Sequence, residues 1–189
     1  MNAGTFDHIL KMLFAVDDSE INTEGRPHTI LAAIGVENAA SVETALAKLK
    51  AEFGLLPTDE IKWNGMKPVP QQKREALSHE LLGILQKSIP LVVISEGRQK
   101  QTAAKRMATQ ITDCFAAHPI ETGERLDLVF DESILSHESE YADFLRTLAP
   151  SSIVSATLGI LHSHQSAAIQ LADVWAGFNR LLTDMSRPV

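Results

Sequence analysis

The chain has 189 residues, 44% hydrophobic and 22% charged, which is typical of one globular domain with its own core. The formal net charge of −7 excludes a protein that coats nucleic acid by bulk positive charge, but it leaves open a nuclease with metal-binding acids. The single cysteine excludes an intrachain disulfide and a cysteine-based zinc site. Because we find neither a bilayer-spanning apolar run nor a signal-peptide pattern, we expect a cytoplasmic protein without membrane association.

Apolar periodicity predicts strands and helices that alternate along most of the chain. The expected strands are 9–16, 28–36, 60–63, 89–95, 125–130 and 152–161, and the expected helices are 41–53, 71–87, 99–117, 137–148 and 166–183. The first two strands fit an antiparallel hairpin across a loop, and the first helix has Ser41 as its expected N-cap and Gly54 as its end. We therefore expect a single α/β domain over residues 1–189, with a mixed central sheet and helices on its faces.

Acidic residues follow two of the expected strands in the same way. The first strand runs into Asp17-Asp18-Ser19, and the strand at 125–130 runs into Asp131. If these strands are parallel neighbours, their carboxyl ends line one crevice, and Asp17 and Asp131 face each other. Such acids repel each other unless a cation lies between them. The alternative, that each acid caps a turn or a following helix, is the more common role for either cluster taken alone.

A Glu-x-Lys pattern at Glu60 and Lys62 is the third acidic feature. Alternate residues of a strand share a face, so the carboxylate and the ammonium are expected on one side. In a nuclease, Glu60 would complete a metal site and Lys62 would hold a phosphate, whereas the alternative is a surface ion pair of little energetic value. The neighbouring Trp63 either stacks on a base or packs under a loop.

The apolar helical stretch 168–178 carries one carboxylate, Asp173, in its middle. No Lys or Arg lies within one helical turn of it, and a buried carboxylate without a cation is costly. The small residues Ala172, Ala176 and Gly177 allow a neighbouring element to approach closely. We expect Asp173 to reach a metal ion shared with acids from elsewhere, the alternative being a partly exposed helix residue.

Together these acids supply the oxygen ligands that hard cations prefer, so the expected cofactor is Mg²⁺ or Mn²⁺. The proposed ligands are Asp17, Glu60, Asp131 and Asp173. Four carboxylates are enough for a pair of ions about 4 Å apart, an arrangement that activates water in phosphodiester hydrolysis.

The motifs also occur in a familiar order. Asp-Asp-Ser at 17–19 follows an apolar strand, Glu-x-Lys lies at 60–62, an apolar strand ends in Asp131, and Gln-Leu-Ala-Asp occupies 170–173. From about residue 9 to residue 184, this pattern resembles the domain of unknown function 3800 family, a ribonuclease H-like group of presumed nucleases. The family has Gly where this chain has Glu20, which indicates a different turn there.

The resemblance implies a ribonuclease H-like fold and a metal site of the Asp-Glu-Asp-Asp type. In ribonuclease H enzymes a loop histidine just ahead of the last carboxylate assists product release or proton transfer, and His164 or His162 matches that place. The alternatives for these histidines are a structural role or a metal pair, although nothing completes a zinc site.

Positive side chains are concentrated in one part of the chain, where eleven of the seventeen Lys and Arg residues lie between Lys48 and Arg106. We expect this region to contact phosphates, although solvated helices also carry such charges. The preferred function is a metal-dependent nuclease, a hydrolase that acts on DNA or RNA. The alternatives are a catalytically inactive nucleic-acid-binding module and a nucleotide phosphohydrolase.

Overall fold

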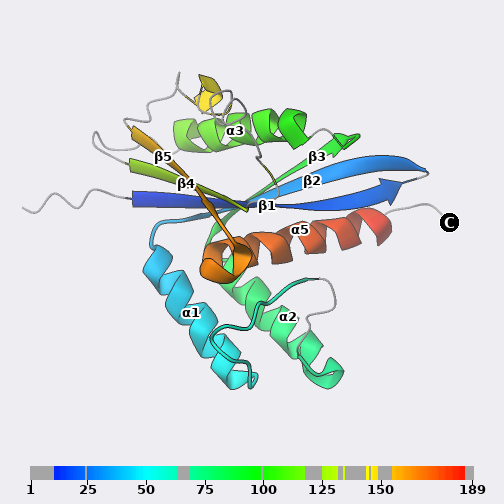
Figure 1. The fold of residues 1–189 in the computed structure, drawn as a ribbon, viewed down its shortest axis with the longest axis vertical. Helices are drawn as coiled ribbons and strands as arrows, with labels where there is room; N and C mark the ends of the chain where they lie inside the picture. Colours follow the sequence, from blue (N-terminus) through cyan, green and yellow to red (C-terminus); the bar gives the residue numbers. More distant parts are fainter. Residues whose placement is uncertain are drawn as a thin grey trace, which may run out of the picture.

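The computed structural model describes residues 11–23, 25–63, 69–98, 100–117, 125–131, 134, 144, 146–148 and 155–185. Its centre is a five-stranded mixed sheet with the order β3-β2-β1-β4-β5 (Figure 1). The strands are β1 (Lys11–Thr23), β2 (Arg26–Val36), β3 (Ile89–Glu96), β4 (Arg125–Asp131) and β5 (Ser155–Leu161). β2 pairs antiparallel with β1 and β3, while β4 pairs parallel with β1 and β5, which confirms the mixed sheet and the initial hairpin.

Helices cover both faces of this sheet, as predicted. They are α1 (Ala39–Glu52), α2 (Gln71–Leu85), α3 (Lys100–Ala117) and α5 (Ala167–Met185), with a 3₁₀ turn η1 (Ser163–Gln165) before the last. α3 lies on one face and α5 on the other, and α1 and α2 pack beyond α5 (Figure 1). Most of the helix expected at 137–148 lies outside the described residues. Within that range the structure describes 144 and 146–148, and these are helical.

The pleat of β1 and β4 sorts their side chains between the two faces. Phe14 of β1 and Phe130 of β4 are fully buried in the core that contains Met107 of α3. Ala15 points the other way and packs against Ile169 of α5. Because side chains alternate along a strand, the two acids at positions 17 and 131 face α5, and residue 18 faces α3.

The prediction that the first strand ends at Val16 in an acidic turn is wrong. β1 continues to Thr23, and its last pair with β2 is Thr23 with Arg26. Glu20 lies opposite Thr29 within this ladder, so the different turn expected there is wrong too. The reason is that β2 satisfies the backbone hydrogen bonds of the polar half of β1, whatever the side chains are.

Two smaller predictions are also corrected. The N-cap of α1 is Asn38, whose side chain accepts a hydrogen bond from the backbone N–H of Ser41, so Ser41 is not the cap. Gly54 does follow the end of this helix, in the left-handed conformation with φ of 74°. The segment 60–63 is not a strand, because its backbone binds side chains of α5 instead of a neighbouring strand.

Candidate functional site

Asp17 lies at the centre of the acidic cluster, on the face of β1 that α5 covers. Its residue is 7% exposed, and its Oδ1 accepts a hydrogen bond of 2.7 Å from the backbone N–H of Asp18. Burial, followed by the negative charges of Asp173 and Asp131, raises the pKa of Asp17 to about 8, although that hydrogen bond acts in the opposite direction. The parallel pair Val16–Phe130 sets Asp17 beside Asp131, as the parallel-neighbour argument predicted.

Asp173 reaches the same cluster from α5. Burial raises its pKa, while a hydrogen bond of 2.7 Å from the backbone N–H of Trp63 to its Oδ2 and the charge of Lys62 act to lower it. The charge of Glu60 acts to raise it again. The four predicted acids therefore influence one another in the series Asp131, Asp17, Asp173, Glu60. Asp173 has no cation on its own helical turn, but Lys62 supplies one from a distant segment.

Glu60 and Lys62 form an ion pair although they do not lie on a strand. The Nζ of Lys62 is 3.2 Å from Oε1 of Glu60, and the side chains are 54% and 25% exposed, respectively. Burial acts to lower the pKa of Lys62, but the hydrogen bond and charge of Glu60, aided by Asp173 and Asp17, raise it overall. The hydroxyl of Ser163 also donates to Oε1 of Glu60. Glu60 is thus held by one cationic and one hydroxyl donor.

Trp63 packs on the helix α5, whereas the two roles predicted for it were stacking on a base and packing under a loop. A Cβ atom at Gly177 would overlap the Cβ and ring atoms of Trp63, so only glycine allows this close approach. The ring also meets Phe178 edge-on, with centroids 6.1 Å apart. The predicted use of small residues on this helix is therefore confirmed at Gly177.

His164 lies in η1, and its exposed ring stacks on that of His162 with centroids 5.3 Å apart. It lines a pocket of about 390 Å³ that also contains Lys50 and Gln170. The residue next to His164, Ser163, contacts the acidic cluster, because its hydroxyl donates to Glu60. No sequence motif indicated this role for Ser163. The proton-transfer or product-release role of His164 stays a prediction.

The three residues that come directly after Asp17 on β1 each meet a positive side chain. Lys100 forms an ion pair of 2.9 Å with Asp18, and Arg98 lies 3.9 Å from a carboxylate oxygen of Glu20. Arg180 donates to the hydroxyl of Ser19. Within the part of the chain that the structure describes, no Lys or Arg forms such a pair with Asp17. Asp17 is thus a buried acid that has no Lys or Arg partner among the described residues.

The acids fit a hard divalent cation in their chemistry, because all the donors are carboxylate oxygens. Burial and the two neighbouring acids raise the pKa of Asp17, and a cation between these acids would act to lower it. Among the described residues, however, no three His, Cys, Asp or Glu side chains are grouped closely enough to hold a metal ion. The contacts of Glu60 with Lys62 and Ser163 engage one of the expected ligands elsewhere.

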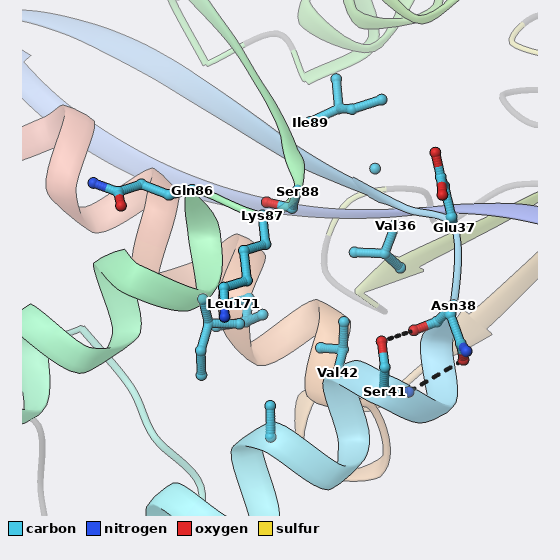
Figure 2. A pocket seen from close by; sticks show the side chains of 13 residues that line it. Val36, Glu37, Asn38, Ser41, Val42, Gln86, Lys87, Ser88, Ile89 and Leu171 are labelled. Atoms are coloured by element: carbon cyan, nitrogen blue, oxygen red, sulfur yellow. Dashed lines mark hydrogen bonds between the residues drawn. The ribbon is translucent and has the colours of Figure 1, made fainter.

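A separate pocket of about 580 Å³ lies where β2 ends and β3 begins, beside the start of α1. Figure 2 shows Asn38 hydrogen-bonded to Ser41 at its edge, with Lys87 and Leu171 nearby. None of the four acids lines this pocket. The candidate site is therefore the acidic cluster between β1, β4, α5 and segment 60–63.

Comparison with known proteins gives no family for this chain. No family model matches it, and no curated protein matches it at a significant level. The resemblance to the domain of unknown function 3800 family therefore stays an expectation that rests on the short motifs. Of the helices that the structure describes, none is both long and apolar enough to cross a membrane.

Proposed function

We propose that this chain is a metal-dependent nuclease that hydrolyses phosphodiester bonds of DNA or RNA. The observation that supports this most is the burial of Asp17 beside Asp131 and Asp173 on one face of the sheet. Like charges in a buried site are unfavourable unless a cation joins them. A binding site for Mg²⁺ or Mn²⁺ explains why a fold would carry this unfavourable cluster.

The proposed ligands are Asp17, Asp131 and Asp173, with Glu60 completing the set. When bound, a pair of divalent cations supplies an activated water and stabilises the leaving oxygen in phosphodiester hydrolysis. Lys62 is more than half exposed beside these acids, so its ammonium is available to bind a phosphate oxygen of the substrate. The N–H of Trp63 fixes one oxygen of Asp173 and so orients its carboxylate.

Two further features support the proposal. The mixed sheet with helices on both faces is compatible with the ribonuclease H-like fold that the motif resemblance implies. Arg180 of α5 donates to Ser19, on the same face of β1 as Asp17, where it adds positive charge next to the acids for contacts with substrate phosphates. Phosphate contacts of this kind provide most of the affinity for nucleic acids. Cytoplasmic localisation stays a prediction.

The test is cleavage of labelled DNA and RNA oligonucleotides in Mg²⁺ or Mn²⁺. We expect Asp17→Asn and Asp173→Asn to lower the rate by about 100-fold or more, since even the outer partners of metal ligands are worth about 10- to 100-fold. Asp18→Asn is the matched control, because it alters the next residue on the opposite face, and it should retain the wild-type rate within a few-fold. Equal cleavage by wild type, Asp17→Asn and Asp173→Asn would contradict the proposal.

The second candidate function is a nucleic-acid-binding module without catalysis. It is favoured by the finding that no three potential ligands are grouped closely among the described residues. Calorimetric titration with Mn²⁺ separates the two, because the module would bind oligonucleotides but not millimolar metal. A nucleotide phosphohydrolase would use the same acids, and it would turn over free nucleotides faster than oligonucleotides.

A further inference from the structure

Gln170 is a buried polar residue of α5 to which the proposed function assigns no role. It is 2% exposed, and both ends of its amide bond to backbone groups outside its own helix. Its Oε1 accepts a hydrogen bond of 3.3 Å from the backbone N–H of Ile61, and its Nε2 donates one of 3.0 Å to the backbone carbonyl of Ser163. The buried site therefore requires a side chain that both donates and accepts a hydrogen bond, because an apolar residue would leave both backbone partners unsatisfied.

The same face of α5 holds the segment 60–63 at two further points. Asp173, three residues after Gln170, accepts from the N–H of Trp63, two residues after Ile61. Gly177 then receives the ring of Trp63. Residues three and four apart lie on one side of a helix, so Gln170, Asp173 and Gly177 form a single row. This row binds the backbone of the segment without making it part of the sheet.

Both partners of Gln170 adjoin Glu60. Ile61 is the next residue of the chain, and Ser163 donates its hydroxyl to the Glu60 carboxylate. Through its two hydrogen bonds, Gln170 therefore joins the segment that carries Glu60 to the turn that contacts Glu60. Loss of its amide would release both restraints together.

We propose that Gln170 is a positioning residue that sets the direction of the Glu60 carboxylate toward the acidic cluster. This inference rests on the proposed metal-dependent function, in which Glu60 is a ligand. Gln170 touches neither the cation nor the substrate, and it acts through Ile61 and Ser163. Outer partners that orient metal ligands are worth about 10- to 100-fold in metal affinity or activity.

The experiment compares wild type with Gln170→Met, which keeps the length of the side chain but removes both hydrogen bonds. Trp175→Phe is the matched control on the same helix, since it removes one side-chain hydrogen bond of 3.1 Å to the carbonyl of Leu91. Mn²⁺ affinity is measured by calorimetry, and amide hydrogen exchange of Ile61 is measured by NMR without metal. For Gln170→Met we expect at least about 10-fold weaker Mn²⁺ binding and faster exchange at Ile61, with neither change in Trp175→Phe.

The outcomes separate the two proposals. If wild type binds no Mn²⁺, the metal-dependent function fails, and the positioning role fails with it. If wild type binds Mn²⁺ and Gln170→Met binds equally well, only the positioning role is overturned. If Gln170→Met does not fold, Gln170→Asn decides in its place, because the shorter side chain keeps an amide but cannot span both partners. Equal Mn²⁺ affinity of Gln170→Asn and wild type would overturn the inference in the same way.

Discussion

Asp17 and Asp18 are consecutive residues of β1 with opposite surroundings. Asp18 faces α3 and forms an ion pair of 2.9 Å with Lys100, whereas Asp17 faces α5 and lies among acids that raise its pKa. The pleat alone causes this difference, because it turns neighbouring side chains to opposite faces. The number of acids in a motif therefore does not predict their effect on stability. The face of the sheet that each acid occupies decides whether it stabilises the fold.

The largest expected effect is on stability at high pH. The pKa of Asp17 is raised from 3.8 to about 8 in the folded chain, so the folded state holds a proton that the unfolded state has lost between these values. The free energy of unfolding therefore falls as the pH rises through this window, by up to about 1.4 kcal/mol per pH unit, and the whole loss is present above pH 8. Asp17→Asn should remove most of this slope and be more stable than wild type at pH 9 in metal-free buffer by at most about 6 kcal/mol, the value of a shift from 3.8 to about 8. Urea unfolding from pH 4 to pH 9 measures the free energy of unfolding of both proteins. The same dependence on pH in wild type and Asp17→Asn would refute the prediction.

A bound divalent cation should offset the loss of stability that the ionised Asp17 carboxylate causes. If the acids bind Mn²⁺, wild type gains about 2.7 kcal/mol of stability at a metal concentration of 100 times Kd. Asp17→Asn should gain far less, and Asp18→Asn should gain as much as wild type. Thermal unfolding with and without Mn²⁺ checks this, and an equal gain in wild type and Asp17→Asn would break the distinction between the two faces.

Asp18→Asn should act with the opposite sign to Asp17→Asn at high pH. It removes a charged partner from Lys100 in a pair whose side chains are only 28% and 10% exposed, so we expect a loss of about 1.5 kcal/mol. Lys48→Met is the control, because it breaks the exposed pair with Glu52 and should change stability by less than about 0.5 kcal/mol. Urea midpoints at pH 7 give both values, and a stabilising Asp18→Asn would contradict the expectation.

The smallest expected effect on stability is that of Gly177→Ala. The added methyl group overlaps Trp63, and overpacking costs about 1 to 3 kcal/mol, of which helix propensity returns about 1 kcal/mol. We expect a net loss of about 1 kcal/mol together with weaker Mn²⁺ binding, since Trp63 is displaced from the helix that carries Asp173. Gly83→Ala in α2 is the matched control, because nothing lies within 4 Å of a Cβ atom added there. A variant Gly177→Ala as stable as Gly83→Ala would refute the packing argument.

Local pattern was enough to predict most of the fold. The apolar runs located all five strands of the described sheet, and the order of strands and helices indicated that the sheet is mixed. The parallel pairing that sets Asp17 beside Asp131 was a condition of the sequence argument, and the structure supplies it. The nuclease activity and the metal stay predictions.

What the pattern missed depends on contacts between distant residues. Glu60–Trp63 was expected as a strand, but its backbone binds Gln170 and Asp173, more than 100 residues away. No periodicity in either segment encodes that contact, because it replaces a strand partner with side chains of a helix. Ser163 was missed for the same reason, since its importance comes only from lying against Glu60 in space.

The row Gln170, Asp173 and Gly177 also sets the order in which the cluster can form during synthesis. β1, segment 60–63 and β4 all leave the ribosome before α5, although a domain generally folds as a unit. Until residues 167–185 are available, Ile61 and Trp63 lack their partners on α5, and Asp17 lacks Asp173 as a neighbour. A chain that is still being translated therefore carries the separate acids without the assembled site.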